Sequence, residues 1–248
     1  MTRFCQKIGC KGYPDFKLRF LAELRQASSQ AHAIEGEVLM TPRENAVSLL
    51  RKITEVQHRS VEQTRAELDL NQLIRVYQRL LDAQHLDFYA YDSSACIAEY
   101  ACNQFYFAGK RAQIYRDTNM QGLNASILAT GHVAILLSHT GRNARLVALA
   151  KLLRRNGTPV IAITCSRQCP LADAASEALV AVTLRDQINE FWVQSFASSA
   201  KYLLDLLDLL ASMVFSQDYA HNMEHNARYE AFGRDNLWPL MEEKPYKK

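Results

Sequence analysis

The run His132-Val-Ala-Ile-Leu-Leu137 is followed by Ser138-His-Thr-Gly-Arg-Asn143 and by a third segment at residues 144–156. Residues 133–137 of the first run are apolar and rich in branched side chains, which is typical of a fully buried strand. The third segment places leucine and alanine at helical spacing between basic residues, and Gly157 then ends the helix. These three segments predict a strand, a polar loop and a helix.

The polar loop at residues 138–143 offers two hydroxyl groups and the amino end of the following helix. Backbone N–H groups without partners and the positive end of the helix dipole gather at such a position, and together they suit a phosphate group. The alternative interpretation is an ordinary helix cap made by hydroxyl and amide side chains. Loop composition alone leaves both interpretations open.

The rest of residues 86–183 alternates between short strands and helices. We predict strands at 86–91, 112–116, 133–137, 160–164 and 178–183, with helices at 93–108, 122–129, 144–155 and 171–176. Strands joined by helical crossovers form a doubly wound parallel sheet. Ligands of such sheets bind at the carboxyl ends of the strands, so we expect a site formed by the loops at 92–94, 138–143 and 165–166.

Helical periodicity continues on both sides of the sheet. Thr41-Pro-Arg-Glu44 predicts a helix start with a hydroxyl N-cap, and residues 59–84 continue in helical periods. Residues 188–215 predict a long helix with more apolar positions than one sheet face covers, so we expect a homodimer or a homotetramer. Residues 26–41 are small and polar, as in a linker.

The composition is that of a globular protein with a substantial core: 248 residues, 48% hydrophobic and 22% charged. No apolar run approaches the ~20 residues of a membrane-spanning helix, and the first residues lack the apolar core of a signal peptide. We therefore expect a cytoplasmic protein with no membrane partner. Its six cysteines show no Cys-x-x-Cys spacing, so we expect them to be reduced and structural, with no metal and no cofactor.

Positive charge is concentrated at the amino end of the chain. The net charge is +3, yet residues 1–25 hold six basic and two acidic residues and so carry +4 by themselves. A nucleic-acid surface is therefore expected in this segment. A solvated charged face is the alternative.

The stretch Thr2-Arg-Phe-Cys-Gln-Lys-Ile-Gly-Cys-Lys-Gly-Tyr-Pro-Asp-Phe-Lys17 resembles the end of the helix-turn-helix domain of the RpiR/MurR family of bacterial transcriptional regulators. In that family a similar run forms the recognition helix and the segment directly after it. Because the family carries further helices before this point, we expect a truncated product, or a start further upstream, whose specific DNA binding needs those missing helices. The resemblance implies DNA contacts by Thr2, Arg3, Gln6, Lys7 and Lys11.

Residues 60–215 resemble the sugar isomerase (SIS) domain, which is the effector-binding part of the same regulators. The family loop Ser-x-Ser-Gly-x-Thr aligns with residues 138–143, which keep hydroxyls at the first and third positions. The family's first loop, Gly-x-Gly-x-Ser, aligns with Ala90-Tyr-Asp-Ser-Ser94, where both glycines are replaced and Asp92 brings a carboxylate. The resemblance implies a sugar phosphate bound by Ser93, Ser94, Ser138, His139, Thr140, Gly141 and Asn143.

The two resemblances predict three regions: a partial helix-turn-helix domain and linker at 1–40, a SIS domain with its leading helices at 41–215, and a C-terminal tail at 216–248. The expected fold class is α/β, a doubly wound five-stranded parallel sheet that is SIS-like and is preceded by an all-α segment. The predicted function is a DNA-binding transcriptional regulator of carbohydrate metabolism that senses a sugar phosphate and has no catalytic residues. A SIS ligand-binding protein without DNA binding is one alternative.

A sugar-phosphate isomerase is the other alternative, since aldose–ketose isomerisation needs a general base near the reactive carbons of the sugar. Glu190, His139 and His221 are the candidate bases. His221-Asn-Met-Glu-His225 also fits a spacing found in zinc peptidases. A catalytic zinc needs a third protein ligand, so an exposed helix is the favoured interpretation of this motif.

Overall fold

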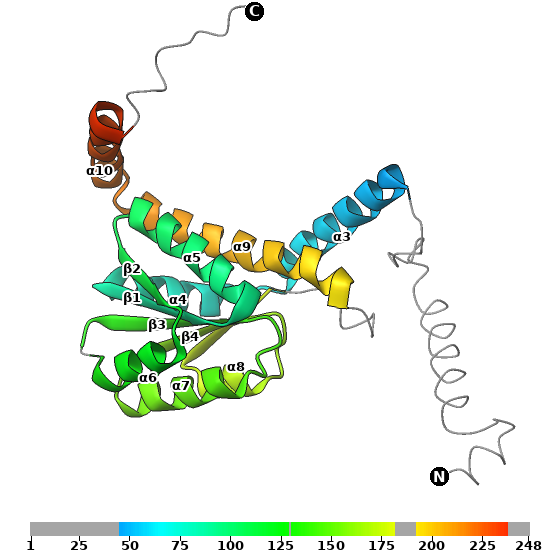
Figure 1. The fold of residues 1–248 in the computed structure, drawn as a ribbon, viewed down its shortest axis with the longest axis horizontal. Coiled ribbons are helices and arrows are strands. Elements are labelled where there is room, and N and C mark those ends of the chain that lie inside the picture. Colours follow the sequence, from blue (N-terminus) through cyan, green and yellow to red (C-terminus); the bar gives the residue numbers. More distant parts are fainter. Residues whose placement is uncertain (1–44, 129, 182–191, 238–248) are drawn as a thin grey trace, which may run out of the picture. The chain divides into compact units, whose positions relative to one another are not determined.

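The computed structural model of the chain describes residues 45–128, 130–181 and 192–237. Its centre is a five-stranded parallel sheet in the order β2-β1-β3-β4-β5 (Figure 1). The strands are β1 (His85–Ala90), β2 (Arg111–Tyr115), β3 (His132–Ser138), β4 (Val160–Thr164) and β5 (Glu177–Val180). The predicted doubly wound α/β sheet is confirmed, and every predicted strand overlaps an observed one.

The strand order defines where a ligand can bind. The chain passes from β1 outward to β2 and then returns to β3 on the other side of β1. In a sheet of this order, the crevice outside the carboxyl ends of β1 and β3 is the topological switch point at which ligands bind. The loops at 91–94 and 138–143 follow these two strands.

Helices cover both faces of the sheet (Figure 1). On one face lie α4 (Leu70–Asp82), α5 (Asp92–Phe107) and α9 (Trp192–Gln217), and on the other lie α6 (Thr118–Ile127), α7 (Ala144–Arg155) and α8 (Pro170–Ala174). The observed bounds of α7 and β4 are those predicted. Helix α6 begins four residues earlier than expected, because Asp117 accepts two backbone N–H groups and caps it there.

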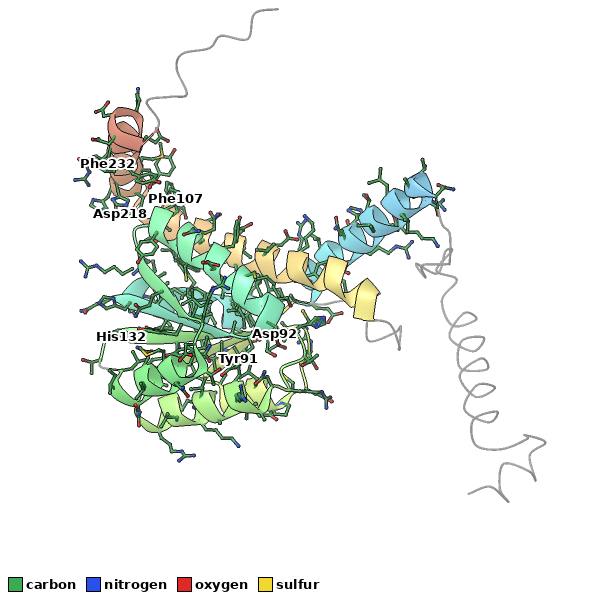
Figure 2. All side chains as sticks on the ribbon, in the orientation of Figure 1. Tyr91, Asp92, Phe107, His132, Asp218 and Phe232 are labelled. Carbon is green, nitrogen blue, oxygen red and sulfur yellow. The ribbon has the colours of Figure 1, made fainter. Side chains whose placement is uncertain are left out.

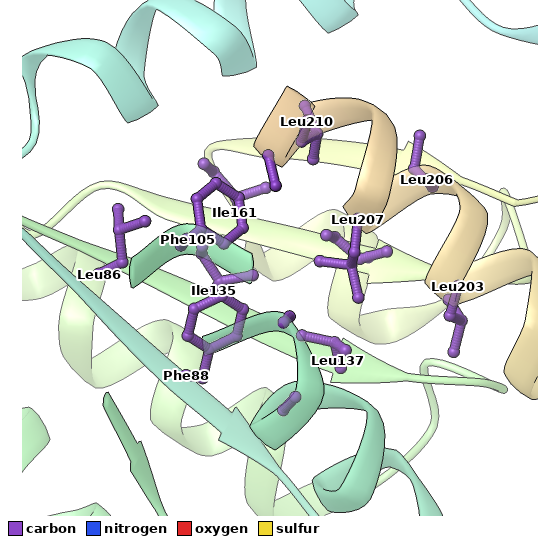
Figure 3. Packing of buried hydrophobic residues seen from close by; sticks show 14 of the residues in the cluster. Leu86, Phe88, Phe105, Ile135, Leu137, Ile161, Leu203, Leu206, Leu207 and Leu210 are labelled. Carbon is purple, nitrogen blue, oxygen red and sulfur yellow. The ribbon is translucent and has the colours of Figure 1, made fainter. Parts of the chain in front are cut away.

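The larger core lies between the sheet and the helices α5 and α9 (Figure 3). Phe88, Ile135 and Ile161 of three neighbouring strands meet Phe105 of α5 and Leu207 of α9, and each of these side chains is at most 1% exposed. Burying a side chain of this size stabilises a protein by about 1.5–3 kcal/mol. Much of the apolar surface of α9 is therefore covered within a single chain, and the assembly expected from that helix stays a prediction.

The second core, beneath α6 and α7, contains a polar contact between β1, β2 and α6. The Tyr89 hydroxyl, fully buried, donates to Oδ1 of Asn124, and Nδ2 of Asn124 donates to the Tyr115 hydroxyl at 2.8 Å. Burial raises the pKa of the Tyr89 hydroxyl far above its ordinary value, with a further contribution from the Asp87 carboxylate. These three side chains hold α6 in register with the two strands.

A second polar group is buried at the amino edge of the sheet. Asp87 of β1 is fully buried and accepts Nε2 of Gln113 at 2.8 Å, while its other carboxylate oxygen lies 2.6 Å from Nδ1 of His132. The ring of His85 stacks on that of His132 with centroids 4.7 Å apart. Because a buried carboxylate is costly unless it is hydrogen-bonded or paired, these contacts stabilise the alignment of β1, β2 and β3.

Helix α3 (Ala46–Glu67) precedes α4. The helix start expected at residues 41–44 lies outside the described residues. Within them, Asn45 has an extended backbone and its side chain caps α3. The continuous helical period expected over 59–84 is also interrupted, because Asp69 accepts two backbone N–H groups of the next turn and caps α4 separately.

The segment expected as a tail contains further helix. Helix α9 runs to Gln217, and α10 (Tyr219–Phe232) follows it, ending in a π-helical turn at Gly233–Leu237. His221 and His225 are exposed on α10, as the exposed-helix interpretation predicted. Within the described part of the chain, no group of three or more metal-ligating side chains is found.

The cysteines depart in one respect from the expectation. Those that the structure describes, Cys96, Cys102, Cys165 and Cys169, form no disulfide, and all but Cys96 are buried. Cys96 is exposed on α5, so a structural role is wrong for this residue. The chain does not pack it, because position 96 faces solvent between the buried Ala95 and Ile97.

Several predicted residues lie outside the described ranges, namely Thr2, Arg3, Gln6, Lys7, Lys11 and Glu190. In the part that the structure describes, no helix has the length and apolar character needed to cross a membrane.

Candidate functional site

The loop at 138–143 is held by its own hydroxyl groups. Ser138, buried at the carboxyl end of β3, accepts the backbone N–H of Gly141 with its Oγ at 3.1 Å. The exposed Thr140 accepts the backbone N–H of Arg142 at 3.3 Å. A hydroxyl that accepts such a bond still carries a proton to donate. Both side chains can therefore shape the loop and donate to an anion at the same time.

Gly141 is required in this loop for two reasons. Its φ of +61° lies in the left-handed region, and a Cβ at this position would lie 2.2 Å from Sγ of Cys169. Its carbonyl accepts the backbone N–H of Leu171 at 3.0 Å. The loop after β3 is therefore packed directly against the start of α8.

Asn143 is the N-cap of α7. Its Oδ1 accepts the backbone N–H groups of Arg145 and Leu146 at 3.0 and 3.2 Å. This is the helix-cap arrangement that the loop composition left open. The acceptor oxygen of Asn143 thus serves the helix, whereas the hydroxyls of Ser138 and Thr140 face the loop.

The first loop contains a residue with positive φ that is not glycine. Asp92 has φ +51°, and it is the non-glycine residue with positive φ in the described part of the chain. Aspartate tolerates this conformation better than most residues, and Asp92 adopts it at a position where the family's first loop has glycine. Its side chain is exposed, as is that of Ser93, whereas Ser94 is buried.

Helix α5 starts at this loop without a side-chain cap. Its N-cap residue, Tyr91, makes no side-chain capping bond, unlike Asn143 of α7. The first N–H groups of α5 are therefore available to a ligand or to water. Figure 2 shows Tyr91 and Asp92 at the opposite edge of the sheet from His132.

Tyr91 is a residue that the sequence reasoning did not single out. Burial raises the pKa of its hydroxyl, while the nearby Arg145 and a hydrogen bond with the Thr118 side chain act in the opposite direction. Tyr91 is thereby linked to α6 through Thr118 and lies near the charge of Arg145 on α7. The place of Tyr91 within the first loop was the available signal, but its partners are distant in sequence.

The loop after β4 is the third loop that borders the candidate site. Thr164 is fully buried, and its Oγ1 donates to the carbonyl of Ser166 and accepts the Ser166 N–H, both at 2.8 Å. The backbone N–H of Cys165 donates to the carbonyl of the half-buried His139 at 2.9 Å. The loops after β3 and β4 are therefore directly hydrogen-bonded.

Strand register brings the predicted residues to one edge. Ala90 pairs with Leu137, and Ser138 pairs with Thr164. The first loop, the loop at 138–143 (the serine loop) and the loop after β4 consequently begin at the same level of the sheet. This edge is suited to an anion rather than to a cation. It carries hydroxyl groups, the uncapped start of α5 and the basic side chain of Arg145.

The candidate bases of an isomerase are not gathered at this edge. Helix α10 meets the far end of α5, where Nδ2 of Asn226 donates to the carbonyl of Phe107 at 3.2 Å and the rings of Phe107 and Tyr229 are 6.2 Å apart. Figure 2 shows Phe107 and α10 far from Asp92. His221 therefore lies away from the site, and His139 is the one candidate base within the described ranges that belongs to it.

The chain is similar to known proteins that contain a SIS domain or are HTH-type regulators. A family model for the SIS domain matches residues 79–213. The HTH-type transcriptional regulator HexR of Escherichia coli K12 is 32% identical over 184 residues, which are 74% of this chain and 61% of that protein. An uncharacterized HTH-type transcriptional regulator of Haemophilus influenzae is 30% identical over 181 residues, which are 73% of this chain and 62% of that protein. The chain spans about three fifths of the length of these relatives.

A solved structure extends the likeness over most of the chain. The Vibrio vulnificus NanR protein complexed with ManNAc-6P superimposes with a TM-score of 0.66 at 21% identity, covering 93% of this chain and 79% of that one. At this identity the likeness shows the fold alone. Because the SIS model matches more than half of the chain, and because its relatives include regulators of the kind that its residues resemble, the chain belongs to the SIS domain family, in the RpiR/MurR type.

Proposed function

We propose that the chain is the effector-sensing part of a transcriptional regulator, and that its SIS domain binds a sugar phosphate at the carboxyl edge of the sheet. The single observation that carries the proposal is the placement of the loops of Ser94 and Ser138 on either side of the β1–β3 switch point. NanR, with a similar fold, is complexed with ManNAc-6P, which supports this ligand class for the present chain.

The phosphate is bound by groups that carry hydrogen-bond donors. The hydroxyls of Ser93, Ser94, Ser138 and Thr140 and the first N–H groups of α5 donate to its oxygens, and Gly141 lets the loop backbone approach. His139 of the same loop also belongs to the residues that bind the ligand. Asn143 acts indirectly, by holding the amino end of α7 in place. The exposed Asp92 carboxylate stays at the solvent side, where it disfavours a second phosphate group on the ligand.

The DNA-binding role is assigned to the amino-terminal segment. Residues 1–25 carry the concentrated positive charge and the stretch that resembles a recognition helix, and the curated relatives are HTH-type regulators. We assign phosphate and base contacts to Thr2, Arg3, Gln6, Lys7 and Lys11. Residues 41–215 form the ligand domain of a cytoplasmic homo-oligomer.

An isomerase is the second candidate, since other solved structures with this fold are described as candidate phosphosugar isomerases. Regulators among the curated relatives and the distance of His221 from the site favour sensing over turnover. Incubation with phosphorylated aldoses, followed by chromatographic analysis for the ketose, separates the two functions.

A thermal-shift panel of phosphorylated hexoses, pentoses and amino sugars tests the proposal. A ligand that binds only the folded state adds about 2.7 kcal/mol at a hundred times its Kd, which raises Tm by roughly 5–10 °C for a chain of this size. Ser138→Ala reduces the shift, whereas Ser126→Ala does not, because Ser126 is exposed on α6 and only bonds the carbonyl of Leu123. The proposal fails if no member of the panel exceeds the shift given by inorganic phosphate.

A further inference from the structure

The last turn of α3 is bound by a side chain from the loop after β4. Nη2 of Arg167 donates to the backbone carbonyl of Glu67 at 2.8 Å and to Oε2 of the same residue at 3.2 Å. Glu67 is the final residue of α3, so its carbonyl is one of those that lack a partner within the helix. A cationic group at this end also interacts favourably with the helix dipole. Arg167 thus caps a helix one hundred residues earlier in the chain.

Arg167 lies in a loop that is attached to the serine loop at both ends. Before it, the Cys165 N–H donates to the carbonyl of His139, and after it, the Leu171 N–H donates to the carbonyl of Gly141. Cys169 of the same loop leaves no room for a Cβ at Gly141. A continuous set of contacts therefore connects the serine loop with the loop at 165–171 and, through Arg167, with the last turn of α3.

Few side chains of helix α3 are buried in the described part of the chain. Among its described side chains, Ser60 alone is buried. The helix packs against α9, and a cavity of about 150 Å³ lies between them, lined by Val61, Leu68, Leu206 and other residues of both elements. An element with few buried contacts has low local stability. The loss of the Arg167–Glu67 contact, an ion pair whose side chains are 56% and 40% exposed, is therefore expected to change the opening of this last turn by a small but measurable factor.

We propose that Arg167 is a positioning residue that reports the state of the serine loop to α3. The biological role of this coupling rests on the proposed function, because α3 connects the SIS domain to the amino-terminal segment in the chain. Its physical content is the coupling between residues 138–143 and the last turn of α3, and that coupling exists without any ligand. It can therefore be measured separately from ligand binding.

Hydrogen exchange of the full chain, without ligand, tests the coupling. Gly141→Ala displaces the serine loop against Cys169, and Arg167→Ala removes the contact with Glu67. We expect each substitution to accelerate amide exchange at residues 62–68 at least threefold relative to the amides of β4. The double variant exchanges no faster than Arg167→Ala alone, because both changes act through one contact. Arg167→Lys keeps the charge, and we expect its exchange rate at residues 62–68 to lie between those of wild type and Arg167→Ala.

Gly157→Ala is the matched control for Gly141→Ala. Gly157 has φ +82°, so the substitution strains the backbone in the same way, but a Cβ there meets nothing within 4 Å. It leaves exchange at residues 62–68 at the wild-type rate. If Gly141→Ala fails to fold, Ser138→Ala takes its place with an expected acceleration of about twofold, since it removes only the acceptor of the Gly141 N–H.

Three results overturn the inference: wild-type exchange at residues 62–68 in the folded serine-loop variant, effects of the two substitutions that multiply, or the same acceleration in Gly157→Ala. The failure of every sugar phosphate to bind changes none of these rates. Such a failure contradicts the proposed function and leaves the coupling to be judged by exchange alone.

Discussion

Removing the imidazole of His132 should destabilise the fold severely. Asp87 is fully buried, and its carboxylate has two side-chain partners, Gln113 at 2.8 Å and His132 at 2.6 Å. His132→Ala leaves one carboxylate oxygen buried without that partner. Breaking a buried pair in this way costs about 3–5 kcal/mol, because the desolvated group is no longer compensated.

Urea unfolding followed by circular dichroism measures this loss, and at about 2–4 °C per kcal/mol the accompanying fall in Tm is roughly 6–20 °C. His58→Ala is the control, since His58 is an exposed histidine that faces Glu62 at 3.7 Å on α3, and it costs under about 0.5 kcal/mol. In an Asp87→Asn background the cost of His132→Ala falls, because no carboxylate is left to be compensated. Equal losses for His132→Ala and His58→Ala would refute this account of the amino edge.

Three further predictions concern reactivity, core packing and DNA. Mild alkylation of the folded protein, mapped by peptide mass spectrometry, modifies Cys96 and spares Cys102 up to about pH 9, because burial raises the pKa of the Cys102 thiol to about 12; modification of both at equal rates would contradict the described burial. Leu207→Asp abolishes folding, as judged by circular dichroism, because Leu207 is fully buried. Leu209→Asp, at a 40% exposed position, stays folded and weakens the predicted oligomer in light scattering. A folded Leu207→Asp variant would show that α9 is wrongly placed. DNA binding, measured by fluorescence anisotropy, falls steeply with salt, and Arg3→Ala or Lys7→Ala weakens it; binding that is unchanged by salt and by both substitutions excludes residues 1–25 as the DNA surface.

The fold could be read from the sequence because hydrophobic periodicity and chain order determine it. The apolar run at 133–137 and the helix at 144–155 lie where they were predicted. The loops that come after β1 and β3 had to lie at one edge once the strands were parallel. Predictions of this kind depend on local pattern, and local pattern survives the replacement of individual residues.

The details that escaped prediction depend on contacts between distant parts of the chain. Asp92 adopts the backbone that a glycine would supply, which no composition rule identifies. Arg145 acts electrostatically on Tyr91, and Arg167 hydrogen-bonds to Glu67, at sequence separations that periodicity does not address. The break between α3 and α4 was missed because apolar spacing continues across it, while the decisive residue is the single N-cap Asp69.

The central claim is that a phosphate group is bound by the serine loop at the carboxyl edge of the sheet. Isothermal titration of the sugar phosphate that gives the largest thermal shift, beside the same sugar without its phosphate, tests it most directly. We predict that the unphosphorylated sugar binds at least tenfold more weakly to the wild-type chain, and that Ser138→Ala weakens the phosphorylated ligand at least tenfold while Ser126→Ala leaves it unchanged. Equal affinity for the two sugars, or an affinity that is the same in Ser138→Ala and in wild type, would contradict the claim.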